Sequence, residues 1–148
     1  MKPLALGSSL LAIVGSVVSL TLPATAINAA YFAKTTQVLY FPPVGGQQLI
    51  LGEILLPPGQ WIVNYSATAG NNGTNGIVRC YVRAKETGEI ISIHAAALGT
   101  QLGGSITTTV GGVTLVNLNQ PTTMVLTCTH DYTNGRPFID SGAEIAAY

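Results

Sequence analysis

Alternating side chains in the segment Gln60-Trp-Ile-Val-Asn-Tyr-Ser-Ala-Thr-Ala69 are the clearest structural signal in this chain of 148 residues. One set of positions is aromatic and aliphatic, and the other is mostly small and polar. The first set is Trp61, Val63, Tyr65 and Ala67, and the second is Ile62, Asn64, Ser66 and Thr68. Because successive side chains of a strand point to opposite faces of a sheet, this period of two predicts a half-buried β-strand.

Strand-like runs recur through the rest of the chain, and turn residues such as Pro57-Pro58-Gly59 separate them. No segment after Ala30 has the pattern of a long helix. The expected strands cover residues 35–41, 48–56, 60–69, 76–84, 90–98, 105–118, 122–130 and 143–148. Gly111-Gly112 leaves open whether 105–118 is one bulged strand or two shorter strands. Turns at this spacing predict an all-β antiparallel sandwich or barrel of about eight to ten strands.

The first residues have the pattern of an export signal. Met1-Lys2 is positive, the segment Leu4 to Leu22 is apolar, and Ala24-Thr25-Ala26 has the small residues that a signal peptidase requires. We expect a signal helix over residues 1–26 that is cleaved after Ala26, a linker over 27–34 and a sandwich domain over 35–148; Ala29-Ala30 offers a second possible cleavage site. A retained membrane anchor is the alternative, but no basic cluster follows the apolar run. The mature chain is therefore expected to be secreted, extracellular or at the cell surface, with the periplasm also open, and outside the membrane.

Cys80 and Cys128 are predicted to form one disulfide, because exported chains mature in an oxidising compartment. Each cysteine shares a face with the apolar residues of its own strand, so the bond is expected to cross the interior of the sandwich. Closing this loop stabilises the fold by about 4 kcal/mol in the chain-entropy model. A metal site with His94 and His130 is the alternative, but none of the four has close ligand spacing.

The composition excludes some partners and favours others. Six basic and six acidic residues give a formal net charge of zero, whereas nucleic-acid binding requires clustered positive charge. Charged residues make up 8% of the chain and hydrophobic residues 47%, so the chain can bury a core, and little repulsion opposes association with itself.

No catalytic or cofactor site is evident. His94 alternates onto the polar face of its strand with Ser92, and His130 precedes Asp131 near a turn, where a surface position is expected. Adjacent strand residues point to opposite faces, so His130 and Asp131 do not form a catalytic pair. We expect a protein that is not an enzyme, has no cofactor and holds no metal; a hydrolase of the cell envelope stays open if a histidine meets a carboxylate in a pocket.

A weak ligand surface is suggested by exposed aromatic and amide side chains, which can stack on and hydrogen-bond a glycan. The candidates are Tyr81, Tyr132, Asn71 and Asn72. The alternative is that Tyr81 packs at a subunit face and that the asparagines only make turns.

A family resemblance rests on Leu56-Pro-Pro-Gly-Gln-Trp-Ile-Val-Asn-Tyr-Ser-Ala67, on the two cysteine strands and on the short final strand ending in Tyr148. In this order they resemble small secreted bacterial β-sandwich domains with the jelly roll of tumour necrosis factor and complement globular heads. The resemblance implies a jelly roll, a binding or assembly role without catalysis, and homo-oligomers, with trimers foremost. A carbohydrate-binding or adhesin module and a pilus-type subunit are the alternatives, and a pilus subunit would need a free donor strand around residues 31–41.

Overall fold

The computed structural model describes residues 31–73, 76–98, 106–131 and 137–148, and every regular element in these ranges is a β-strand. The strands are β1 (Tyr31–Lys34), β2 (Leu39–Tyr40), β3 (Leu49–Leu56), β4 (Gly59–Asn71), β5 (Gly76–Ala84), β6 (Ile90–Leu98), β7 (Ile106–Leu118), β8 (Thr122–His130), β9 (Phe138–Ile139) and β10 (Glu144–Ala147). Within the described ranges, no helix is long and apolar enough to cross a membrane.

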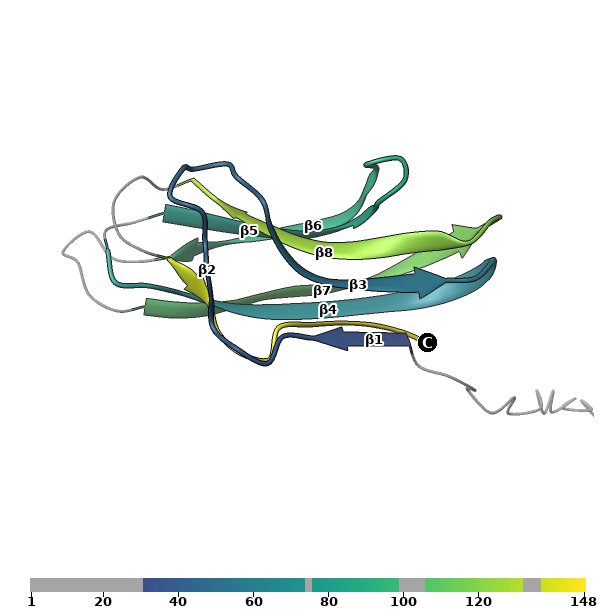
Figure 1. The fold of residues 1–148 in the computed structure, drawn as a ribbon, viewed down its shortest axis with the longest axis horizontal. Helices are drawn as coiled ribbons and strands as arrows, with labels where there is room; N and C mark the ends of the chain where they lie inside the picture. The colour runs from purple at the N-terminus through teal and green to yellow at the C-terminus, as the bar shows by residue number, and fades with distance from the viewer. Residues whose placement is uncertain (1–30, 74–75, 99–105, 132–136) are drawn as a thin grey trace, which may run out of the picture.

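The strands form two antiparallel sheets packed as a jelly-roll sandwich (Figure 1). In sheet A the order is β1-β10-β4-β7, and the short strands β9 and β2 extend the sheet beside the far end of β4. In sheet B the order is β3-β8-β5-β6. This alternation of early and late strands is the double-sheet arrangement of a jelly roll. The predicted fold class is therefore confirmed.

The N-terminal part of the domain differs from the prediction. Residues 31–34, expected to be a linker, form β1 and pair with β10, while the expected strand over 35–41 contributes only the two-residue β2. Thr35 anchors the bend after β1, because its N–H donates to the carbonyl of Ala143 at 2.8 Å. The stretch considered as a free donor strand is thus largely paired within its own sheet.

The glycine pair in β7 does not bulge the strand. β7 pairs with all thirteen positions of β4 without a shift in register. The two backbones approach closely here, since a Cβ built on Gly111 would lie 2.5 Å from the carbonyl oxygen of Tyr65. Of the two alternatives for 105–118, the long strand is correct, but the glycines provide space for neighbouring groups rather than a bulge.

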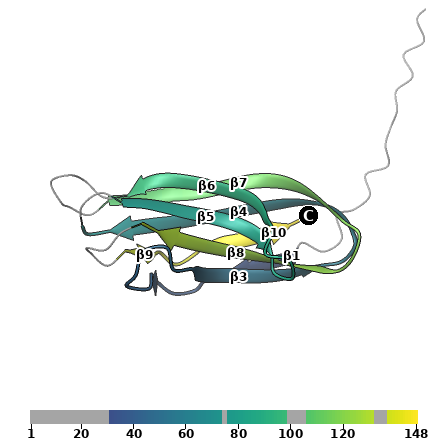
Figure 2. The same ribbon diagram turned by 90° about the horizontal axis from the view of Figure 1, so that it is seen from above.

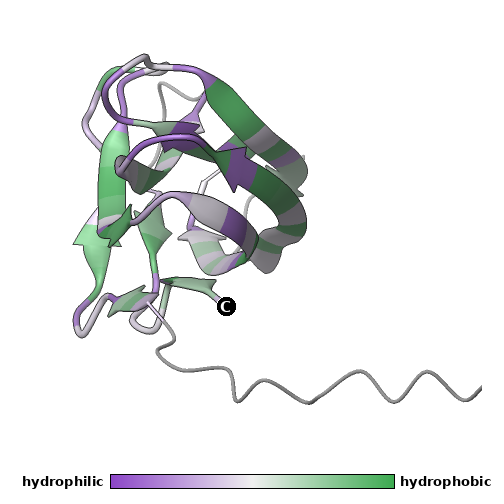
Figure 3. Cartoon of the chain, turned by 90° about the vertical axis from the view of Figure 1, so that its right-hand side faces the viewer, coloured by the Kyte–Doolittle hydropathy of each residue, from purple (hydrophilic) through white to green (hydrophobic). Residues whose placement is uncertain are grey.

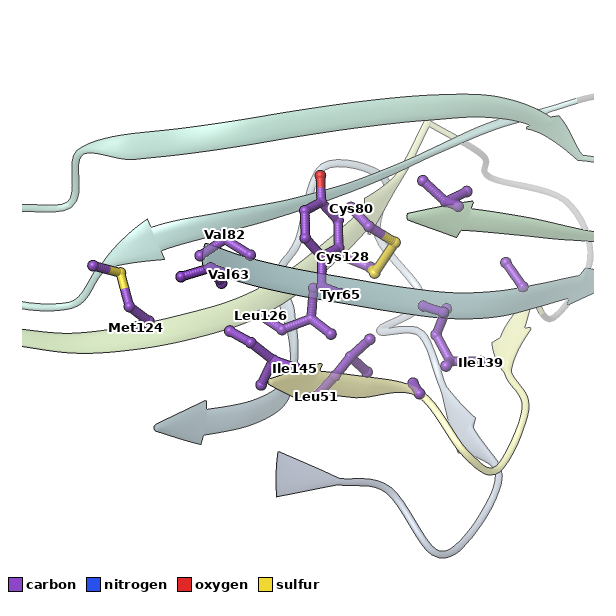
Figure 4. Close-up of a cluster of buried hydrophobic side chains, with 14 of the residues drawn as sticks. Leu51, Val63, Tyr65, Cys80, Val82, Met124, Leu126, Cys128, Ile139 and Ile145 are labelled. Atoms are coloured by element: carbon purple, nitrogen blue, oxygen red, sulfur yellow. A yellow bond between two sulfur atoms is a disulfide. The ribbon is translucent and has the colours of Figure 1, made fainter. Parts of the chain in front are cut away.

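The core lies between the sheets and contains the disulfide beside the ring of Tyr65 (Figure 4). Cys80 in β5 and Cys128 in β8 are directly opposite each other in neighbouring strands, with 4.1 Å between their Cα atoms. The predicted pairing is confirmed, and both cysteines face the core. The prediction that the bond crosses the interior was wrong, because the bond joins two strands of the same sheet.

In β6 the polar face points into the sandwich and the aliphatic face points outward, which is the reverse of what its amphipathic pattern predicts. Ser92 and His94 are opposite Val82 and Cys80 of β5, so they point toward the sandwich interior. Ile93 points outward and is 51% exposed. From above, β6 lies over β7 along one edge of the sandwich (Figure 2). This position explains the polarity, because the inward side chains of an edge strand meet the rim of the opposite sheet rather than the middle of the core.

Candidate functional site

The outer face of sheet A carries an apolar patch assembled by strand register. Near the start of β4, Ile62 pairs with Leu115 of β7 on one side. On its other side Ile62 exchanges two backbone hydrogen bonds of 3.1 Å with Tyr148. Val113 lies two residues before Leu115 in β7, and Phe32 is on β1 at the far edge. Because residues two apart in a strand share a face, these side chains all point away from the core and into solvent.

These outward side chains form what we call the sheet A patch. Its members are Phe32, Ile62, Val113, Leu115 and Tyr148, and each is between 48% and 69% exposed. Figure 3, coloured by hydropathy, shows apolar bands in strands of both layers of the sandwich. Single exposed hydrophobic residues are ordinary, but a group that extends over β1, β4, β7 and the residue after β10 is typical of an interaction surface.

The patch has little charge around it. The Asn64 amide lies between Ala146 and Val113 in the register, and the ion pair of Lys34 with Glu144 at 3.9 Å lies at the border of the patch. An exposed ion pair of this kind adds no net charge and only a weak electrostatic field to the surface beside the patch. The surface can therefore be desolvated at lower cost than a charged surface of the same size.

The residues predicted as a ligand surface do not come together. Tyr81 lies on the outer face of sheet B but is only 7% exposed, since it packs between its neighbours on that face. Asn71 ends β4 in sheet A and is 1% exposed, with its Oδ1 accepting the N–H of Gly73 at 3.2 Å. Asn72 is exposed in the turn that follows, and Tyr132 lies outside the described residues. The glycan hypothesis thus gains no geometric support from these residues.

Tyr65 links the two sheets at the edge where β6 passes over β7. Its hydroxyl is 2.7 Å from Nδ1 of His94 and 3.2 Å from Oγ of Ser92. Burial raises the pKa of the Tyr65 phenol, and the hydrogen bond with Ser92 lowers it in part. The His94 ring lies over Gly112, where a Cβ would come within 2.3 Å of it. We call Tyr65, Ser92 and His94 the polar latch, because their hydrogen bonds join the two sheets. No carboxylate belongs to this group.

His130 is buried, and the expectation of a surface histidine was wrong. It is 2% exposed, its Nε2 is 2.9 Å from the carbonyl oxygen of Pro42, and its ring packs on Phe41 at a centroid distance of 5.0 Å. Asp131 points the other way and forms an ion pair with Arg79. The strand places the pair on opposite faces, as the alternation predicts, so they cannot act together. Among the described residues, no three histidine, cysteine or acidic side chains are grouped to hold a metal.

Sequence reasoning missed the sheet A patch for a physical reason. Ile62 lies on the mostly polar side of its strand, and the segment from Val113 to Val116 is apolar on both faces apart from Thr114. Alternation alone cannot say which face of such a strand is outward. The isolated Ile62 between Trp61 and Val63 is the one signal that could have indicated an apolar outer surface.

Solved structures of proteins from a virus particle have a fold similar to that of this chain. No family model and no curated protein matches the chain. The structure of infectious bursal disease virus Gt strain aligns with a TM-score of 0.56 at 10% identity, over 80% of this chain and 32% of that one. For the Gx strain the TM-score is 0.54 at 11% identity, over 81% and 32%.

A third structure, of the T13 particle of the same virus, aligns with a TM-score of 0.53 at 12% identity, over 80% of this chain and 30% of the other. This chain therefore spans about a third of the length of the proteins it matches. Identities this low show a shared fold alone. The class that fold and site define is a jelly-roll sandwich with an apolar outer sheet face, and the likeness to tumour necrosis factor and complement heads stays a prediction.

Proposed function

We propose that this protein is an exported jelly-roll module without catalytic activity that assembles with copies of itself through the sheet A patch. The observation that carries the proposal is the exposure of Phe32, Ile62, Val113, Leu115 and Tyr148 on one sheet face. Apolar surface of this kind gains about 25 cal/mol for every square ångström removed from water. The fold shared with proteins of virus particles agrees with an assembly role.

A second copy of the chain is the occupant that the charges favour. The formal net charge is zero, so two copies meet without long-range repulsion. The patch itself has no charged member that would require an opposite charge on its partner. An apolar surface can pack against a second copy of itself, and a two-fold axis through it gives a closed dimer. The trimer implied by the family resemblance would instead bring the patch against a different surface of the next copy.

Export through cleavage after Ala26 is part of the proposal. It is supported by the apolar run with small residues before Ala26 and by the disulfide between Cys80 and Cys128, a bond typical of oxidising compartments. Sequencing the N-terminus of protein recovered outside the producing cell tests it. A mature chain that begins at Ile27 is the expected result, and recovery of an uncleaved chain would contradict it.

The variant Leu115→Lys tests self-association, because it places a charge at the most exposed position of the patch, 69% exposed. Leu55→Lys is the matched control, since Leu55 is 59% exposed on the outer face of sheet B. Multi-angle light scattering after gel filtration of the mature protein is the measurement. We expect the unaltered chain and Leu55→Lys to have at least twice the monomer mass and Leu115→Lys to have the monomer mass. A monomeric unaltered chain at high micromolar concentration would refute the proposal.

A further inference from the structure

A cleft of about 600 Å³ opens at one end of the sandwich, between the hairpin that joins β5 to β6 and the turn that joins β7 to β8. Its floor is apolar and includes Ala84, Val116 and Met124, all of them core residues that are at most 6% exposed. Clefts of this size, with an apolar floor and a few polar groups at the rim, are typical of binding sites. The cleft goes beyond the proposed assembly function and shares one residue with it: the side chain of Leu115 belongs to the sheet A patch, whereas its backbone lies in the wall of the cleft.

One wall of the cleft is the unpaired edge of β7. Ile62 exchanges both of its backbone hydrogen bonds with Tyr148, so its polar groups point toward β10 and not toward β7. Leu115, directly opposite Ile62, is therefore at a position without hydrogen bonds to β4, and its N–H and C=O point away from β4. Asn117, two residues further on, repeats this geometry. Both residues line the cleft, and β4 is the sole strand that pairs with β7 among the described strands.

The opposite rim is negative. Glu86 and Glu89 of the hairpin line the cleft, and no lysine or arginine is found among its described lining residues. Lys85 is held elsewhere, because its Nζ donates to Glu53 at 2.7 Å. The Glu86 carboxylate is fixed in place by the backbone N–H of Thr123, at 3.0 Å and 3.2 Å from its two oxygens. This hydrogen bonding lowers the pKa of the Glu86 carboxyl, so the group stays ionised.

We propose that the cleft binds an extended peptide segment in which every second residue faces the cleft, and in which these cleft-facing residues are aliphatic with a basic residue at one end. The backbone of the segment adds a strand to the free edge of β7, taking up the N–H and C=O groups of Leu115 and Asn117. Because alternate residues of a strand point to opposite faces, both kinds of side chain belong to the set that faces sheet B. The aliphatic ones lie on the floor formed by Val116 and Met124, and a lysine or arginine at the end of the set faces the hairpin carboxylates. Backbone pairing supplies the strand-like geometry, and the carboxylates select basic over acidic segments.

The probe is the capped pentapeptide acetyl-Val-Ser-Val-Ser-Lys-amide, whose two valines and lysine share one face, added to the isotopically labelled mature protein. Nuclear magnetic resonance follows the amide shifts and the hydrogen-exchange rates of Leu115 and Asn117 during the titration. We expect both amides to gain protection and the shifts to be centred on the cleft. The variant Glu89→Gln should weaken binding by about twofold to fivefold, the range expected for an exposed ion pair. Glu144→Gln, which removes a carboxylate on sheet A, should leave binding unchanged.

Two further peptides make the proposal refutable even where a variant fails to fold. The acidic peptide acetyl-Val-Ser-Val-Ser-Glu-amide should not bind, and the lysine peptide with methylated backbone nitrogens should lose binding because it cannot donate to β7. Equal binding of the acidic and basic peptides, or retained binding after methylation, would overturn the proposal. So would the absence of binding by the lysine peptide at millimolar concentration, or shifts centred on another surface.

Discussion

Alanine at position 112 would test how the edge between β6 and β7 is closed. A Cβ on Gly112 would lie 2.3 Å from Cε1 and 2.5 Å from Nδ1 of His94, so the ring has to swing away. The swing breaks the 2.7 Å hydrogen bond between His94 and Tyr65. A lost hydrogen bond costs about 1 kcal/mol, while alanine restricts the unfolded chain and returns about 0.4 to 1 kcal/mol. We expect Gly112→Ala to lower the free energy of unfolding by less than about 1 kcal/mol.

The neighbouring Gly111→Ala is the matched comparison and should be more costly. Its Cβ would lie 2.5 Å from the carbonyl oxygen of Tyr65 and 3.2 Å from the Cα of Ser66. These are backbone atoms of β4, which pairs with β7 along its whole length, so they cannot rotate away as a side chain does. Forcing extra atoms into a packed site costs about 1 to 3 kcal/mol, and we expect a loss in that range.

Urea unfolding of the oxidised protein measures both variants, and His94→Ala supplies the decisive background. Without the ring, Gly112→Ala should become neutral or stabilising, whereas the cost of Gly111→Ala should not change. The difference between the two backgrounds isolates the contact between positions 94 and 112. If Gly112→Ala is as costly as Gly111→Ala, and if His94→Ala does not relieve it, the proposed latch is not what closes this edge.

Two other predictions concern the core. Replacing both Cys80 and Cys128 with alanine opens a loop with a sequence separation of 48 residues, and it should lower the free energy of unfolding by about 4 kcal/mol in urea unfolding; a loss below about 1 kcal/mol would argue against the chain-entropy account. Because burial raises the pKa of the Tyr65 phenol, the unfolded chain ionises first and stability should fall as the pH rises above about 10. Tyr65→Phe should remove part of this fall in unfolding measured against pH, and an unchanged slope would show that Tyr65 does not cause it.

The sequence predicts sandwich strands well where one face is buried in the core. In β4 the inward residues Val63 and Tyr65 are at most 1% exposed, and the alternation around them matches the observed faces. The cysteine pairing also followed, because both sulfur atoms share the inward parity of their strands. Whether the bond joins two sheets or two strands of one sheet depends on strand order, and strand order is a matter of long-range pairing that local patterns do not contain.

The edges of the sandwich were harder to predict, because burial there depends on the other sheet. The alternation in β6 separates its two faces correctly, but it does not say which face points into the sandwich. In the structure the polar face, with Ser92 and His94, points inward and contacts Tyr65. The placement of His130 failed for a related reason. A histidine at a strand end before a turn is usually exposed, but here the loop at Pro42 folds back over it and supplies a hydrogen-bond partner.

The two outer faces of the sandwich divide its few charges unequally, and this division bears on orientation in an assembly. On the outer face of sheet B, Lys85 pairs with Glu53 and Arg79 pairs with Asp131 in exposed ion pairs. Arg83 lies on the same face, four residues after Arg79 in β5. The sheet A patch has no charged member, and the nearest ion pair lies at its border. Removing the outer face of sheet B from water would cost the hydration of five charged side chains, whereas removing the sheet A patch costs the hydration of small polar groups such as the Asn64 amide. In an assembly the protein should therefore turn sheet A toward its neighbour and leave sheet B, with the acidic rim of the cleft beside it, open to solvent and to peptide.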